Sequence, residues 1–193
     1  DVERSRGLGD VYKRQGQANG LGAPRTVDLN GNGTVDLVYA GDLKGNLWKF
    51  DLTSSNPSNW KVAFSGNPLY TARDSSGNTQ PITAAPIWKM GYDGTGIQVL
   101  FGTGQNIVAT ELGASSVQTV YSIWDQSQYY WTINSGVTGT DTARITGTRE
   151  STLVQQTQKA ANAGDVFFST STNGVAYSLS LIHISEPTRP LYI

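Results

Sequence analysis

Hydrophobic and polar residues alternate along most of this chain with the two-residue period of a β-strand. The alternating runs are short, and stretches rich in Gly, Asn, Ser and Pro separate them. The pattern predicts strands near residues 25–29, 35–41, 46–52, 60–64, 68–72, 82–90, 97–103, 106–110, 117–125, 129–134, 152–157, 165–171 and 174–180. Polar segments full of turn-forming residues predict loops at 53–59, 73–80 and 134–142.

Helical periodicity is nearly absent from the chain. The one helical candidate covers residues 153–163, and it overlaps the strand predicted at 152–157. The sequence therefore predicts an all-β protein, in agreement with its 22 glycines, five tryptophans and nine tyrosines.

A weak internal repeat adds detail to the predicted fold. Residues 33–42 parallel residues 95–104, and the matched pairs are Val35 with Ile97, Leu37 with Val99 and Tyr39 with Phe101. Recurring antiparallel strands of this kind are typical of propeller blades. From the chain length we predict a partial β-propeller of about three to four blades of antiparallel strands with inserted loops.

Composition and charge exclude several classes of function. The chain has 14 basic and 15 acidic residues among 193, so its net charge is −1, and it has no basic run to bind nucleic acid or an anionic membrane. It lacks cysteine, and its single histidine is His183. Thiol catalysis, a Ser-His-Asp triad in the body of the chain and zinc or haem ligation by Cys or His are therefore not expected. No stretch approaches the roughly 18 apolar residues of a membrane span.

The most informative motif is the run Asp-Leu-Asn-Gly-Asn-Gly-Thr-Val-Asp at residues 28–36. Side-chain oxygens stand at relative positions 1, 3, 5 and 9, glycine stands at position 6, and position 7 can offer a backbone carbonyl. This is the oxygen-ligand spacing of a calcium loop. The predicted Ca²⁺ ligands are Asp28, Asn30, Asn32, Thr34 through its carbonyl, and Asp36.

The loop departs from an EF-hand in two ways. Position 12 is Tyr39 instead of a bidentate glutamate, and residues 35–40 alternate like a strand where an EF-hand has its exiting helix. We therefore predict a calcium clip between two strands. The alternative is a plain hairpin turn that uses Asn-Gly twice. Because only Asp28 and Asp36 are charged, the expected dissociation constant is weak, roughly 10⁻⁵ to 10⁻³ M.

Both ends of the chain resemble translated sequencing-adapter read-through. The segments concerned are residues 7–15 and 180–190. We expect residues 1–15 to be a non-native leader and residues 181–193 a non-native tail, which leaves residues 16–180 as the propeller fragment.

The chain is similar to the carboxy-terminal propeller of the PilY family, the tip-associated adhesins and assembly factors of bacterial type IV pili. The calcium-loop pattern followed by residues 39–51 carries the resemblance, with further matches at residues 68–72, 80–86, 99–104, 121–125 and 153–157. The family loop usually has aspartate where this chain has Asn30 and Asn32. The family's amino-terminal region, often with a von Willebrand-type adhesive domain, is not represented in this sequence.

The resemblance implies a non-enzymatic, quinoprotein-like propeller whose calcium loop influences pilus extension and retraction and surface attachment. It implies export to the bacterial cell surface, the pilus tip or the outer membrane. The implied partners are the pilus machinery or minor pilins and, through the amino-terminal region, a host or abiotic surface.

Two other propeller classes are alternatives. Residues 40–47 also resemble blades of pyrroloquinoline-quinone dehydrogenases, but those enzymes draw calcium ligands from many blades and often use a vicinal disulfide. Integrin-α propellers also place a calcium loop before a strand, but they repeat it in several blades, whereas this chain has one such loop. Because all three classes share a fold, the number and placement of sites separates them.

Overall fold

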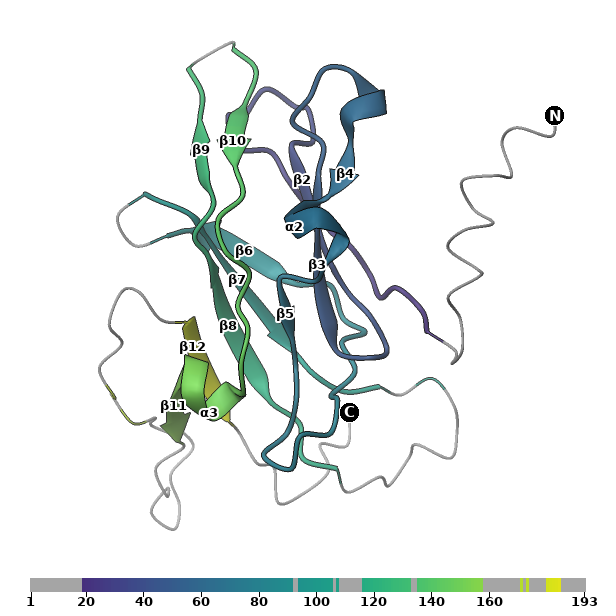
Figure 1. Ribbon diagram of the computed structural model, residues 1–193, viewed down its shortest axis with the longest axis vertical. Coiled ribbons are helices and arrows are strands. Elements are labelled where there is room, and N and C mark those ends of the chain that lie inside the picture. The colour runs from purple at the N-terminus through teal and green to yellow at the C-terminus, as the bar shows by residue number, and fades with distance from the viewer. Residues whose placement is uncertain are drawn as a thin grey trace, which may run out of the picture.

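The computed structural model describes residues 19–91, 94–105, 107, 116–132, 135–157, 171, 173 and 180–184. These residues form two five-stranded sheets and one two-stranded sheet, with three short helical turns between strands (Figure 1). The all-β class predicted from the sequence is confirmed. Nearly all of the predicted strands at 106–110, 165–171 and 174–180 lies outside the described residues.

The first sheet contains the amino-terminal strands in the order β1-β2-β3-β4, and β5 also pairs with β3. Its strands, all antiparallel, are β1 (Arg25–Val27), β2 (Leu37–Gly41), β3 (Asn46–Asp51), β4 (Lys61–Val62) and β5 (Tyr70–Thr71). The turn between β2 and β3 needs Gly45, because its φ is +78° and a Cβ there would lie 2.7 Å from the Gln80 carbonyl oxygen. A 3-10 turn, η1 (Pro57–Asn59), precedes β4.

The second sheet has the order β11-β12-β8-β7-β6. Its strands are β6 (Ile87–Met90), β7 (Ile97–Gly102), β8 (Val120–Asp125), β11 (Leu153–Thr157) and β12 (Ser180–Ile184). All pairs are antiparallel except β11 with β12, which run parallel. Strand β12 lies largely in the predicted non-native tail. It lies between β11 and β8 and pairs with both.

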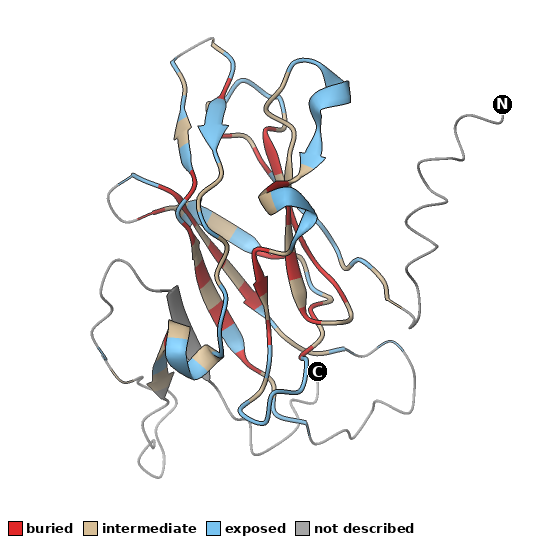
Figure 2. Ribbon diagram, in the orientation of Figure 1, coloured by how far each residue is buried: buried red, intermediate tan, exposed pale blue. Residues whose placement is uncertain are grey.

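The hydrophobic core lies between the two sheets (Figure 2). Five of the six residues matched in the internal repeat lie in this core: Leu37, Tyr39, Ile97 and Val99 are fully buried and Phe101 is 4% exposed, whereas Val35 is half-buried. Tyr121 of β8 joins the two sides, with its ring centroid 5.3 Å from that of Phe101 and 5.5 Å from that of Tyr70. The period-two pattern therefore placed the core-facing residues of both sheets.

Three local features differ from the sequence-based expectations. Residues 134–142, predicted as a loop, contribute β10 (Thr138–Thr140), which pairs with β9 (Gln128–Tyr130) to form a hairpin. The helical candidate at 153–163 is wrong over its first residues, which form β11; a four-residue helix, α3 (Arg149–Thr152), lies just before them. Strand pairing with β12 explains this outcome, since tertiary pairing overrides a weak local helical preference.

The segment labelled α2 (Ala63–Gly66) is a left-handed turn. Phe64 and Ser65 have φ values of +53° and +57°. Left-handed backbone costs roughly 1–2 kcal/mol for each residue that has a Cβ. The turn places the Phe64 ring over the ammonium of Lys49, 4.9 Å from the nitrogen to the ring centroid.

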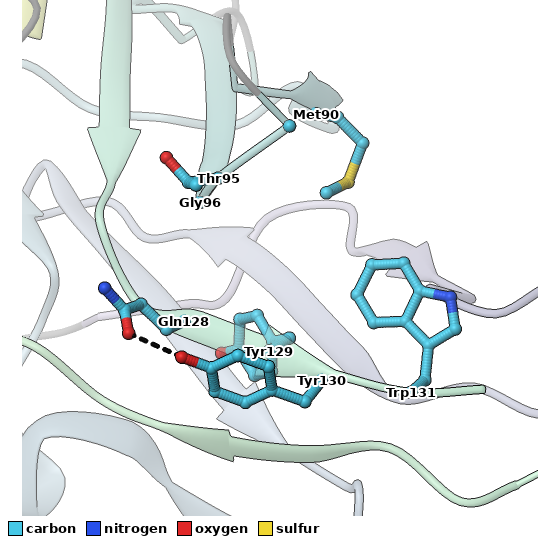
Figure 3. Close-up of a pocket in the computed structure, with 8 residues that line it drawn as sticks. Met90, Thr95, Gly96, Gln128, Tyr129, Tyr130 and Trp131 are labelled. Carbon is cyan, nitrogen blue, oxygen red and sulfur yellow. Dashed lines mark hydrogen bonds between the residues drawn. The ribbon is translucent and has the colours of Figure 1, made fainter.

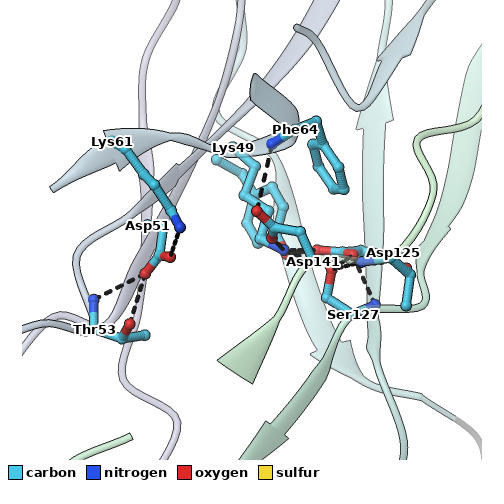
Figure 4. A network of polar contacts seen from close by, with 10 residues as sticks. Lys49, Asp51, Thr53, Lys61, Phe64, Asp125, Ser127 and Asp141 are labelled. Carbon is cyan, nitrogen blue, oxygen red and sulfur yellow. Dashed lines mark hydrogen bonds and ion pairs between the residues drawn. The ribbon is translucent and has the colours of Figure 1, made fainter. Parts of the chain in front are cut away.

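Lys49 of β3 is fully buried and joins the first sheet to the second sheet and to the hairpin (Figure 4). Its Nζ lies 2.8 Å from Asp125 Oδ2 at the end of β8 and 2.9 Å from Asp141 Oδ1 just after β10. It also donates to the Ser127 hydroxyl, 2.8 Å away, just before β9. The Tyr39 hydroxyl donates to Asp125 Oδ2 at 2.6 Å, and burial first, then the Asp125 charge, raises the pKa of Tyr39 so that it stays protonated.

Removal of the Lys49 charge should strongly destabilise the fold. In Lys49→Met, Asp125 and Asp141 would remain close together without their cation, and such a change costs about 3–5 kcal/mol. Urea unfolding would measure it. Lys61→Met is the matched control, because Lys61 is 61% exposed and pairs with Asp51 at 3.5 Å, so its loss should cost no more than about 1 kcal/mol. Equal effects of the two changes would contradict the assigned role of Lys49.

Candidate calcium site

The candidate calcium loop, residues 28–36, connects the antiparallel strands β1 and β2. Its two ends are held firmly: Val27 pairs with Leu37, the Asp36 N–H donates to the Val27 carbonyl at 2.8 Å, and the Leu52 N–H donates to the Asp36 carbonyl at 2.9 Å. The predicted placement between two strands is therefore confirmed. These contacts fix the backbone positions of the first and last predicted ligands, Asp28 and Asp36.

Inside the loop, the predicted ligands accept hydrogen bonds from the loop's own backbone. Asp28 accepts from the N–H groups of residues 31, 32 and 33 at 2.8–3.3 Å. The Asn30 side chain accepts from Asn32 N–H at 3.2 Å, and the Asn32 side chain accepts from Thr34 N–H at 2.7 Å. Gly31 and Gly33 have φ values of +72° and +85°, which permit this tight course. The bonds wrap the backbone around the side-chain oxygens.

Exposure to solvent changes along the loop. Asp36 is 5% exposed, Asp28 and Asn30 are half-buried, and Asn32 and Thr34 are exposed. Asp36 Oδ2 accepts from Leu29 N–H at 2.7 Å, and its other oxygen accepts no hydrogen bond from the described residues. Burial, and secondarily the charge of Asp28, raise the pKa of Asp36, while the bond from Leu29 opposes them.

The donor set fits a hard, oxygen-preferring cation. Two carboxylates, two amide oxygens and one backbone carbonyl are the ligand types that calcium takes, with water completing the shell. Among the described residues, no group of three or more His, Cys, Asp or Glu side chains is placed so that it could hold a metal ion. Tyr39, at position 12, is buried with its hydroxyl on Asp125, so it is no ligand.

One partner of the loop was missed by sequence reasoning. The Asn30 Nδ2 donates to the carbonyl of Ser135 at 2.7 Å, although the two residues are 105 positions apart. Ser135 lies in the connection between β9 and β10. No spacing rule links Asn30 to Ser135, because only the packing of the hairpin against the loop brings them together.

The comparisons with known proteins agree with this architecture. The family described as the PilY1 beta-propeller domain matches residues 7–172. The chain belongs to the PilY1 β-propeller family. The crystal structure of the Pseudomonas aeruginosa PilY1 C-terminal domain matches with a TM-score of 0.69 and 32% identity, over 89% of this chain and 40% of that one.

Curated relatives in the PilY1 family cover shorter stretches. The type IV pilus biogenesis factor PilY1 of Pseudomonas aeruginosa strain PAO1 is 42% identical over 135 residues, which are 61% of this chain and 12% of that protein. A PilY1 homolog of Xylella fastidiosa strain Temecula1 is 40% identical over 112 residues, 55% of this chain and 8% of that protein. The chain thus spans a small part of the curated relatives that it matches.

A pocket of about 130 Å³ lies between the β6–β7 connection and β9 of this family member (Figure 3). Residues 90 and 94–96 line one side, and residues 128–131 line the other. Tyr130 is 64% exposed, and its hydroxyl donates to Gln128 Oε1 at 2.8 Å. Trp88 and Trp131 pack against the core. Tyr130 instead forms part of the pocket surface.

Among the described residues, no helix is both long and apolar enough to cross a membrane.

Calcium affinity should fall as the pH decreases through the raised pKa of Asp36. Calcium needs the ionised carboxylate, so proton and cation compete for it. In the calcium-free protein, the raised pKa of Asp36 contributes stability to the folded state at pH values below the pKa of this residue in the unfolded chain. This contribution is lost as the pH rises through the pKa of Asp36 in the folded state. Calorimetric titrations at about pH 7.5 and about pH 4.5 would detect weaker binding at the lower pH. Equal affinity at both would contradict a role for Asp36 as ligand.

Proposed function

We propose that this chain is a calcium-binding segment of a type IV pilus protein, in which calcium occupancy regulates pilus extension, retraction and surface attachment. The observation behind the proposal is the loop between β1 and β2, where five oxygen donors lie within nine residues and the strand ends are fixed by the sheet. Membership in the PilY1 family supplies the pilus context.

Asp28, Asn30, Asn32 and Asp36 would hold the ion through side-chain oxygens, and Thr34 through its carbonyl. Burial, and after it the charge of Asp28, raise the pKa of Asp36, and the bound ion would compensate the negative charge of the two carboxylates. With only two carboxylates, the loop suits the weak binding typical of extracellular calcium sites. At a hundredfold excess over Kd, bound ion would stabilise the folded state by about 2.7 kcal/mol.

The family relationship favours this function over the two other propeller classes. A quinone dehydrogenase needs a cofactor cavity at the centre of the propeller and calcium ligands drawn from many blades. In this chain the candidate ligands come from one continuous segment that connects β1 to β2. An integrin-like propeller would need the motif in several blades. A non-enzymatic role therefore suits the chain better than catalysis.

The proposed partners are the pilus machinery or minor pilins, with a host or abiotic surface contacted by a separate adhesive region. The proposed location is outside the cell, at the bacterial surface, the pilus tip or the outer membrane. The P. aeruginosa relative is named a type IV pilus biogenesis factor, which supports this assignment. The weak affinity expected from the ligand charge fits the millimolar calcium of such a location.

Calcium binding should be saturable, with one site, and should be lost in Asp28→Ala/Asp36→Ala. The double change removes both charged ligands, and ligand charge sets affinity. Calorimetric titration with Ca²⁺ would measure it. Asp74→Ala is a matched control, because Asp74 organises a similar exposed turn by accepting from Ser76 and Asn78 N–H groups but has no second carboxylate in its loop. It should leave binding unchanged, and absence of binding in the unmodified chain would make the loop a plain turn.

A bacterial strain whose intact protein contains Asp36→Ala should show altered pilus extension and retraction. The substitution removes the most buried predicted ligand, so the loop would no longer respond to calcium. Surface motility and pilus counts at high and low calcium would report the effect, with Asp74→Ala as the comparison strain. Unchanged calcium dependence in the Asp36→Ala strain would refute the regulatory role even if binding were intact in the unmodified protein.

A further inference from the structure

We infer that calcium at the loop controls the β9–β10 hairpin through the amide of Asn30, so that ion binding fixes the hairpin and the aromatic residues on it. This inference rests on the proposed function and specifies its regulated element. The direct observation is the bond from Asn30 Nδ2 to the Ser135 carbonyl, 2.7 Å long. Figure 1 shows the hairpin beside the connection from β1 to β2.

The oxygen and the nitrogen of the Asn30 side-chain amide bind different parts of the chain. Its Oδ1 accepts from Asn32 N–H at 3.2 Å inside the loop, while its Nδ2 donates to Ser135 outside it. The reverse orientation of the amide would set a donor against the N–H and an acceptor against the carbonyl, so both neighbours fix the observed one. A cation on Oδ1 would hold the planar amide in that orientation and strengthen Nδ2 as a donor.

The hairpin makes polar contacts with the rest of the fold at its base and at its connection, and its Tyr129 and Trp131 side chains pack against the core between them. At its base, Ser127 and Asp141 bind the buried Lys49. At its connection, Ser135 accepts from Asn30, and Val137 adds an apolar anchor at 4% exposure. Strands β9 and β10 pair only with each other within the described part of the chain. Asn30 is the residue of the loop whose side chain hydrogen-bonds to this hairpin.

The hairpin contributes aromatic side chains to the protein surface, so a change in the hairpin would change that surface. Tyr130, the last residue of β9 and 64% exposed, and the following Trp131 line the pocket opposite residues 94–96 (Figure 3). Trp131 precedes Thr132, whose carbonyl accepts from the Ser135 N–H at 2.9 Å. A fixed Ser135 therefore adds a restraint on the aromatic face beyond the packing of Trp131 against the core, and release of Ser135 removes that restraint.

The choice of asparagine at position 30 matters for this coupling. A carboxylate there would still offer calcium an oxygen and would add a negative charge, but it has no N–H to donate and would face the Ser135 carbonyl. Asn32 is the matched position, because its Oδ1 also accepts within the loop, from Thr34 N–H, and its Nδ2 makes no hydrogen bond to the described residues. Asn30→Asp and Asn32→Asp thus add the same charge, and only the first removes the link.

The test is hydrogen exchange of the full chain, read by mass spectrometry on peptides from residues 128–140, with calcium and with a chelator. Calcium should slow exchange there about three- to tenfold in the unmodified chain and in Asn32→Asp, since a hydrogen bond of ordinary net strength shifts local opening by such a factor. Asn30→Asp should show little change. Peptides from β7 are the internal reference for a global effect.

Calorimetry on the same three proteins separates the two hypotheses. Calcium binding by all three, with hairpin protection missing only in Asn30→Asp, would support the coupling. Calcium binding with equal protection in Asn30→Asp, or with no hairpin protection in the unmodified chain, would overturn the coupling and leave the proposed function standing. Absence of calcium binding in the unmodified chain would overturn both.

Discussion

The ammonium of Lys49 is buried without access to water, and the arrangement of the fold depends on how its charge is compensated. Three segments converge on it: the end of β8 through Asp125, the start of the hairpin through Ser127, and the end of the hairpin through Asp141. A buried charge is tolerated only when such partners surround it. The two sheets and the hairpin base are therefore positioned by a single cation.

The backbone next to the Lys49 ammonium contains two residues in the unfavourable left-handed conformation. The left-handed turn at Phe64 and Ser65 brings an aromatic face to 4.9 Å from the ammonium, and the Tyr129 ring lies 5.0 Å from it on another element. Cation–π contacts of a desolvated lysine contribute favourably by up to about 2 kcal/mol, comparable to the cost of a left-handed residue. The strained turn is thus explained by what its side chain contacts.

The calcium loop has the opposite character, because its ends are rigid and its middle is open to solvent. Sheet pairing fixes Val27 and Leu37, while Asn32 and Thr34 are exposed. A site of this kind admits an ion from solvent without disturbing the core. Asn30 links the loop to the hairpin, so the proposed coupling gives the hairpin a permanent attachment at Lys49 and a calcium-dependent one at the loop.

The sequence by itself determined the features that depend on neighbouring residues. The spacing of Asp28 to Asp36 defined the loop, because hydrogen bonds such as that from Gly33 to Asp28 form within a few residues. The period-two pattern likewise located inward positions such as Tyr39 and Val99. Only the tertiary structure decided the contacts of Lys49 with Asp141 and of Asn30 with Ser135. Lys49 shares the buried face of β3 with Leu47, which signals an unusual position but names no partner. Partners so distant in sequence depend on strand register and on the packing of one sheet against another, which local spacing does not encode.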